Sequence, residues 1–267
     1  MTRIADRLAA LRAQKRTALV PFITAGDPRL DVTVPALQAL VRGGADIVEV
    51  GIPFSDPEAD GPAIQAASER ALANHVRLAD VLDLVAEFRA TNATTPVILM
   101  GYLNSVLRMG IREFAERAAA AGVDGLIMVN LPPEEAVELK RELRTRNMDL
   151  IFLIAPTTTD ERMALIERMA SGFIYYVSLK GTTGANHIAI DSVAENVARL
   201  RRHSQLPLLV GFGIKDGATA KAVAEHADGV VIGAALVNRM GELAGTPDAI
   251  PDALFERLSA IREALDG

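Results

Sequence analysis

Short apolar runs rich in β-branched residues recur along this sequence. Each is followed by a glycine- or proline-bearing turn and a longer segment of helical period. Continuous apolar runs are typical of strands that are buried on both faces. Strand–helix alternation indicates a parallel sheet joined by right-handed crossovers. The sequence predicts eight such strands, at Ala18–Thr24, Asp46–Ile52, Val97–Gly101, Gly125–Val129, Leu150–Ile154, Phe173–Val177, Leu208–Gly211 and Gly229–Ile232.

The segments between the runs have the pattern of amphipathic helices. Leu78–Ala90, Ile111–Ala121 and Glu134–Arg146 each place apolar residues on one face. Gly43–Gly44 favours the end of a helix before the second strand. Eight units in this length favour a (β/α)8 TIM barrel with extra terminal helices, folded as one domain over residues 1–267. The alternative, an open doubly wound sheet, usually has fewer units.

The charge and composition of the chain exclude several functional classes. The formal net charge is −6 and the pI is about 5.3, so there is no basic footprint for nucleic acid or anionic membranes. No apolar run approaches the roughly 18–20 residues of a membrane span, and the first residues lack the apolar core of a signal peptide. We therefore expect a cytoplasmic protein that binds neither nucleic acid nor membranes.

Patterns for metal and nucleotide sites are missing as well. The chain has no cysteine, which excludes thiolate nucleophiles and cysteine-based metal sites. Gly211-Phe-Gly213 lacks the third glycine of a dinucleotide fingerprint, and there is no Gly-Lys-Ser/Thr phosphate loop. The histidines have no ligand-like spacing, at His75, His187, His203 and His226. We expect neither a metal nor a cofactor in this chain.

A glutamate interrupts the second predicted strand. Alternation places Ile47, Glu49 and Gly51 on one face, so Glu49 faces the barrel lumen if Ile47 does. Active sites of such barrels form at the carboxyl ends of the strands. A carboxyl group buried there has a raised pKa, which suits general acid–base chemistry. The alternative is a solvated glutamate at a strand edge.

The loop after this strand, residues 53–62, is stiff and acidic. It holds two prolines, a closing Gly-Pro pair and the carboxylates of Asp56, Glu58 and Asp60. Two acids in different environments can hold different protonation states, as a paired acid–base mechanism needs. Asp60 and Asp56 are therefore candidates for a second carboxylate, whereas the alternative is that these loop acids are only solvated.

Glycine-bearing turns follow three late predicted strands, at residues 181–185, 211–214 and 233–236. Glycine permits close approach of the backbone, and free N–H groups at a helix start bind anions. Phosphate sites of this fold are built this way at the late strands. The three turns predict a phosphate site, and relief of tight turning is the other explanation.

Motifs spread in order over nearly the whole chain point to one family. They are Pro21-Phe-Ile-Thr-Ala-Gly-Asp-Pro28, Glu49-Val-Gly-Ile-Pro-Phe-Ser-Asp-Pro57, Ala59-Asp-Gly-Pro62, Leu99-Met-Gly-Tyr102, Gly122-Val-Asp-Gly125, Leu131-Pro-Pro-Glu134 and Gly211-Phe-Gly-Ile214. Together they resemble the tryptophan synthase alpha subunit family, and the block from the glutamate through the acidic loop is the most specific part. The resemblance implies a lyase that cleaves indole-3-glycerol phosphate by a retro-aldol reaction. The products are indole and glyceraldehyde 3-phosphate.

The resemblance also implies roles for single residues. Glu49 matches the general acid/base that protonates indole C3 and handles the glycerol hydroxyl proton. Asp60 matches the aspartate that accepts the indole N–H, and Tyr175 and Thr183 match supporting residues near the two carboxylates. The other matches are Gly184, Gly213 and Ala234 as phosphate contacts, with Phe22 and Phe212 in the indole pocket.

A partner subunit follows from the same resemblance. Family members pair with a pyridoxal-phosphate-dependent beta subunit in an α2β2 complex and pass indole to it. The resemblance therefore implies the same partner for this chain, with the cofactor on the beta subunit. Pro53, Asp56 and Asn104 fall in the loops that match this interface, although the loop could simply pack on its own barrel.

Four positions depart from the usual pattern of the family, namely Glu58, Ser105, Asn130 and Ala234. Glu58 adds a charge that should raise the pKa of Asp60 or hold the loop open. Asn130 removes a charge near the site. Two alternatives within the family's chemistry stay open, a stand-alone indole-3-glycerol-phosphate lyase and a catalytically weak allosteric partner of a beta subunit. A third is another phosphate-binding barrel, such as a sugar-phosphate isomerase.

Overall fold

The computed structural model describes residues 2–177, 190–211 and 213–267. Eight parallel strands close into a barrel in sequence order, and β1 pairs with β8 to complete it. The strands are β1 (Ala18–Thr24), β2 (Val48–Gly51), β3 (Val97–Gly101), β4 (Gly125–Met128), β5 (Asp149–Ile154), β6 (Ile174–Val177), β7 (Leu208–Gly211) and β8 (Gly229–Ile232). The TIM barrel predicted from the sequence is confirmed.

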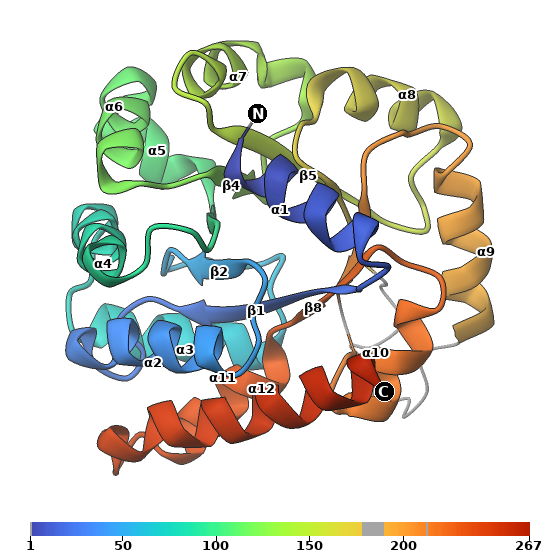
Figure 1. The fold of residues 1–267 in the computed structure, drawn as a ribbon. Helices are drawn as coiled ribbons and strands as arrows, with labels where there is room; N and C mark the ends of the chain where they lie inside the picture. The colour runs from blue at the N-terminus through green and yellow to red at the C-terminus, as the bar shows by residue number, and fades with distance from the viewer. Residues whose placement is uncertain (1, 178–189, 212) are drawn as a thin grey trace.

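Helices surround this barrel (Figure 1). The first six are α1 (Arg3–Ala13), α2 (Leu30–Arg42), α3 (Pro62–Ala73), α4 (Leu78–Thr91), α5 (Leu103–Met109) and α6 (Ile111–Ala121). The later ones are α7 (Val137–Arg144), α8 (Asp160–Met169), α9 (Ile190–Leu200), α10 (Gly217–Ala224), α11 (Ala234–Glu242) and α12 (Ile250–Asp266), with short 3-10 turns η1 (Pro133–Glu135) and η3 (Pro247–Ala249). The expected extra terminal helices are α1, which precedes β1, and α12, which packs on α2.

The single helix predicted over Glu134–Arg146 is wrong, because this segment forms η1 and then α7. The buried residues of α7 are Leu139 and Leu143, whereas Val137 at its start is 66% exposed. Before α7 the buried positions continue through Ala136 and Pro133, at a spacing of three residues. A spacing of three residues puts side chains on one face of a 3-10 turn, which is the form that this turn takes.

Side chains from the strands fill the barrel lumen as a packed core. Three residues of α1, namely Ile4, Leu8 and Leu11, join this core from the amino-terminal end. The strand residues of this lumen cluster are Ala18, Val20, Ile47, Ile98, Ile127, Ile151, Phe173, Leu209 and Val231. In Figure 1, α1 lies across the barrel, and it closes the end opposite to the expected active site.

Three aspartates, two of them buried, tie the strand starts together at this closed end. Each lies just before an even-numbered strand, and its carboxylate accepts a backbone N–H from the preceding odd-numbered strand. The bonds run from Leu19 N to Asp46 (2.9 Å), from Val97 N to Asp124 (2.8 Å) and from Leu208 N to Asp228 (2.8 Å). Arg3 and Arg7 of α1 donate to Asp124 and Asp46, so the same acids also hold α1 in place.

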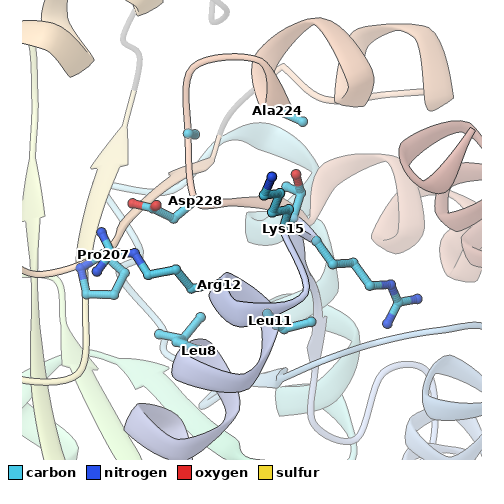
Figure 2. Close-up of a pocket in the computed structure, with 10 residues that line it drawn as sticks. Leu8, Leu11, Arg12, Lys15, Pro207, Ala224 and Asp228 are labelled. Atoms are coloured by element: carbon cyan, nitrogen blue, oxygen red, sulfur yellow. The ribbon is translucent and has the colours of Figure 1, made fainter.

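A cavity of about 240 Å³ lies at the closed end, between α1 and the starts of β7 and β8. Figure 2 shows Arg12 and Lys15 near Asp228 in this cavity. The Asp228 carboxylate is already engaged, because it accepts the Leu208 N–H and pairs with Arg201 at 3.2 Å. The amino-terminal end of a TIM barrel contributes to stability, whereas active sites form at the opposite end.

Candidate active site

Glu49 lies in the middle of β2 and faces the lumen. Its register neighbours are Phe22 of β1 and Ile98 of β3. Ile47, two residues earlier on the same face, belongs to the lumen cluster. The Glu49 side chain is completely buried. The predicted inward orientation is confirmed, and the alternative of a solvated glutamate at a strand edge is wrong.

The environment of Glu49 favours its neutral form. Neither of its carboxyl oxygens has a hydrogen-bond partner among the described residues. Burial raises the pKa of Glu49 to about 8, and the negative charge of Asp60 adds to this shift. Near neutral pH the group therefore carries a proton that it can transfer to a bound molecule.

Asp60 lies in the loop between β2 and α3, where its side chain is partly buried. Tyr102 Oη donates to Asp60 Oδ2 at 3.3 Å, and Gln65 Nε2 donates to the Asp60 carbonyl oxygen at 2.8 Å. Burial raises the pKa of Asp60 to about 6, and the bond from Tyr102 opposes the rise. Glu58 is not among the causes of this rise, so only the other part of the expectation for Glu58, an effect on loop opening, stays a prediction.

Tyr102 is a site residue to which the sequence analysis gave no role. It caps the start of α5 after β3, and its ring stacks on Phe54 with centroids 4.8 Å apart. Its hydroxyl accepts the Ala59 N–H at 3.0 Å while it donates to Asp60. Burial raises the pKa of Tyr102 to about 12, so the hydroxyl stays a donor. Tyr102 thus fixes the acidic loop against the end of β3.

Tyr175 of β6 completes the polar group at the carboxyl end of the barrel. Burial raises the pKa of Tyr175 well above its ordinary value, and the charges of Glu49 and Asp60 raise it further. Its hydroxyl therefore remains protonated. Its position near both carboxyl groups agrees with the prediction from the resemblance.

A small cavity of about 10 Å³ with a mostly apolar wall opens beside Asp60. Asp60 and Tyr102 lie on its wall, and all of its lining residues come from β1 to β4 and the segments that follow these strands. The apolar side chains of this wall are Phe22, Ile52, Ile64, Met100 and Val129. An aromatic ring could enter only if these side chains moved apart, and the Asp60 carboxylate would then lie beside it. Phe22 lies on this apolar wall, and its role in an indole pocket stays a prediction.

A family model described as "Tryptophan synthase alpha chain" matches residues 8–264. This chain belongs to the tryptophan synthase alpha chain family. The predicted membership is thereby confirmed, and with it the lyase function of the alpha reaction in tryptophan biosynthesis. The alternative of a sugar-phosphate isomerase is wrong.

Relatives in the tryptophan synthase alpha chain family match the chain from end to end. The tryptophan synthase alpha chain of Laribacter hongkongensis is 55% identical over 266 residues and covers 100% of both chains. The crystal structure of tryptophan synthase subunit alpha from Legionella pneumophila str. Paris has a TM-score of 0.94 at 45% identity, with 100% of this chain and 99% of that chain covered. A tryptophan synthase complex from Pyrococcus furiosus has a TM-score of 0.84 at 37% identity, covering 92% and 98%.

The phosphate and loop residues predicted from the resemblance are only partly described. Gly213 is exposed after β7 with a φ of +73°, and Ala234 is exposed at the start of α11, where the first N–H groups of a helix lack intrahelical partners. Both positions are open to an anion at the carboxyl end of the barrel. Thr183, Gly184 and Phe212 lie outside the described residues.

The residues predicted at the partner interface differ in exposure. Asp56 and Asn104 are exposed, whereas Pro53 is buried within the chain itself. Asn130 Oδ1 accepts the Leu103 N–H at 2.8 Å, and Asn130 Nδ2 donates to Asn104 Oδ1 at 3.1 Å. The departure from the family at Asn130 therefore supplies an amide that both caps α5 and holds Asn104.

No group of three histidines or carboxylates within the described residues is arranged to hold a metal ion. None of the helices in the described part of the chain combines the length and the apolar character needed to cross a membrane.

Gly211 leaves the space that the Tyr175 side chain occupies. A Cβ at position 211 would lie 2.2 Å from Tyr175 Oη and 2.5 Å from its Cζ. Overpacking of this kind costs about 1–3 kcal/mol and moves side chains. We expect Gly211→Ala to lower kcat/KM for indole release by about 10-fold or more, because it displaces Tyr175 beside the two acids. Steady-state kinetics measure this effect.

Gly245→Ala is the matched control, since a Cβ at this position meets no atom within 4 Å. It should leave kcat/KM unchanged. An unchanged kcat/KM for Gly211→Ala would contradict a role for the packing of Tyr175 on Gly211.

Proposed function

We propose that Glu49 and Asp60 perform the acid–base chemistry of indole-3-glycerol phosphate cleavage in this chain. The observation that carries the proposal is the pair of interacting carboxyl groups with unequal, raised pKa values, about 8 for Glu49 and about 6 for Asp60. Asp60 lies on the wall of the small apolar cavity, as does Phe22, the register neighbour of Glu49. Near neutral pH the pair of carboxyl groups holds one protonated and one charged acid. A reaction that protonates a ring carbon and thereby builds positive charge on the ring needs such a pair, a proton donor and a charged carboxylate.

The proposed reaction follows from these two states. Neutral Glu49 gives its proton to indole C3, and the charged Asp60 accepts the indole N–H and stabilises the positive ring. The Glu49 carboxylate then removes the proton of the hydroxyl on the carbon attached to C3. The bond between that carbon and C3 breaks, its electron pair returns to the ring, and an aldehyde forms. Glu49 ends the cycle protonated, as it began.

A bell-shaped pH profile is expected from these roles. Activity should fall below about pH 6, where the raised pKa of Asp60 lets it take up a proton, and above about pH 8, where Glu49 loses its own. Measurement of kcat/KM for indole release from pH 5 to 9 tests this. In Asp60→Asn the acid limb should disappear from the residual activity, and an acid limb that persists in this variant would belong to another group.

The remaining site residues are part of the proposal. Gly213 and Ala234, together with Gly184, would bind the substrate phosphate through backbone N–H groups, and Thr183 would position Asp60. Phe22 and Phe212 would enclose the indole ring. The exposure of Gly213 and of the α11 start, and the Phe22 wall of the cavity, support these roles.

We further propose a pyridoxal-phosphate-containing beta subunit as the partner, with no cofactor in this chain and a cytoplasmic location. The match to a tryptophan synthase complex supports a partner. Asp56 and Asn104 are exposed at the same end of the barrel as the acids and could contact it directly. Pro53, which is buried, would act by shaping the loop that carries Asp56.

The deciding experiment follows indole release from indole-3-glycerol phosphate, with and without a tryptophan synthase beta subunit. Slow release that rises strongly with the beta subunit supports the lyase and the partnership together. Fast release by the chain alone favours the stand-alone lyase. No release under either condition overturns the proposal, and activation of the beta subunit by such a chain would favour the allosteric role.

A further inference from the structure

Thr24, the last residue of β1, carries a hydroxyl whose place in the site is unexplained. The side chain is 1% exposed, and its Oγ1 has no hydrogen-bond partner in the described part of the chain. Within the same residues, the only other buried side-chain oxygens without a partner are those of Glu49. A dry, unpaired hydroxyl lowers stability, and buried polar groups of this kind call for a specific explanation.

The position of Thr24 connects it to the acidic loop. Strand register pairs Phe22 with Glu49 and Thr24 with Gly51. Thr24 therefore faces the lumen like Phe22 and lies two residues closer than Phe22 to the carboxyl end of the barrel. Gly51 has no side chain that could bond the hydroxyl. Thr24 and Asp60 line the same cavity.

Within the described residues, Asp60 has few donors for the charged form that the reaction needs. Tyr102 Oη, from the start of α5, is the one side-chain donor to its carboxylate among the described residues, and at 3.3 Å the bond is long. The other titratable groups that interact with Asp60 there are Glu49 from β2 and Tyr175 from β6. Neither brings a positive charge. A second donor would complete the environment of the carboxylate.

We propose that Thr24 is a positioning residue whose Oγ1 donates a hydrogen bond to the Asp60 carboxylate when substrate is bound. The inference rests on the proposed role of Asp60. A small movement of the loop at residues 53–61 on substrate binding brings the Asp60 carboxylate within hydrogen-bond distance of the unpaired Thr24 hydroxyl. The bond satisfies both groups, and it leaves the remaining lone pairs of Asp60 directed at the indole N–H.

The test compares Thr24→Val, which keeps the shape and removes the hydroxyl, with Thr24→Ser, which keeps the hydroxyl. A donor stabilises charged Asp60 and lowers its pKa, so its loss moves the acid limb of activity to higher pH. Because the bond forms only with substrate, the limb of kcat should rise by about one pH unit in Thr24→Val. The limb of kcat/KM, which reports the free protein, should stay in place.

The size of the effect follows from the bond type. Loss of one hydrogen bond to a charged group should lower kcat by up to about 10-fold at pH values below both acid limbs, and Thr24→Ser should recover most of it. The unliganded Thr24→Val protein should melt about 2–4 °C higher than the original, because an unpaired hydroxyl has been replaced by a methyl group.

Thr33→Val is the matched control. Thr33 is also completely buried, but its Oγ1 accepts the Gly26 N–H at 2.9 Å. This variant should melt lower and leave both pH limbs unchanged.

The outcomes separate this inference from the proposed function. An original chain that releases no indole removes the function itself. An active original chain with an unshifted kcat limb in Thr24→Val overturns the role of Thr24 alone. A kcat that falls without any shift of the limb likewise overturns it, because the hydroxyl would then act on the substrate directly.

Discussion

Glu49→Gln lowers kcat for indole release by at least about 100-fold, the lower end of what general acid–base catalysis contributes. Gln has nearly the same shape as a neutral Glu, so the substitution removes only the transferable proton. No other described carboxyl group is both fully buried and free of partners in this lumen. Single-turnover kinetics at saturating substrate measure the chemical step. A kcat within a few fold of the original would remove Glu49 from the mechanism.

Thermal unfolding across pH is the control for Glu49→Gln. The folded pKa of Glu49 is about 8, above the ordinary value of 4.5. The folded state therefore binds more protons than the unfolded state in this interval, and stability falls as the pH rises from 4.5 to 8. Gln does not titrate, so the variant should lose this part of the pH dependence and be relatively more stable at pH 8. If the variant were unfolded at every pH, its low kcat would say nothing about proton transfer. A melting temperature close to that of the original protein excludes this explanation.

Asp124→Ala reduces the free energy of unfolding by about 3–5 kcal/mol, the cost of breaking a buried ion pair by removal of one partner. Asp124 is 3% exposed and accepts from Arg89, Arg3 and the Val97 N–H. Its loss leaves the Arg89 guanidinium largely buried without its carboxylate. The loss also removes the cap of β3 and a tie to α1. Urea unfolding followed by circular dichroism measures the change.

Glu116→Ala serves as the matched control for Asp124→Ala. Glu116 also accepts from two arginines, Arg112 and Arg146, but it is about half exposed. Solvent-exposed pairs contribute little, so this variant should unfold close to the original. If both variants lost the same free energy of unfolding, burial would not explain how much the Asp124 network contributes to stability.

The barrel was predictable because each strand is buried on both faces and reads as a continuous apolar run. Ala18–Thr24, Val97–Gly101, Leu208–Gly211 and Gly229–Ile232 coincide with the strands of the structure. The second strand starts later than predicted, at Val48, because the Asp46 side chain instead caps the start of β1. The error at Glu134–Arg146 has a different cause, since periodicity alone does not separate a 3-10 turn from the first turn of an α-helix.

In the candidate site, Glu49 was predictable from alternation within one strand, which is a local pattern. The partner of Asp60 was not, because Tyr102 lies 42 positions further along the chain and only closure of the barrel brings the two together. Thr24 was hidden for a similar reason. In sequence it is an ordinary β-branched strand residue, and only packing shows that its hydroxyl has no partner.

Pairing of β1 with β8 joins the two ends of the chain, and this has a consequence for synthesis on the ribosome. The barrel can close only after Gly229, the register partner of Ala18, has been synthesised. At the usual rate of about 5–20 residues per second, synthesis of the chain between these two residues takes roughly ten to forty seconds. Throughout it, the nascent chain presents an open strand edge at β1, which is a template for wrong pairing with other chains. A chaperone should therefore be most useful in the interval between the synthesis of β1 and the synthesis of β8. The length of this interval does not depend on the stability of the finished barrel.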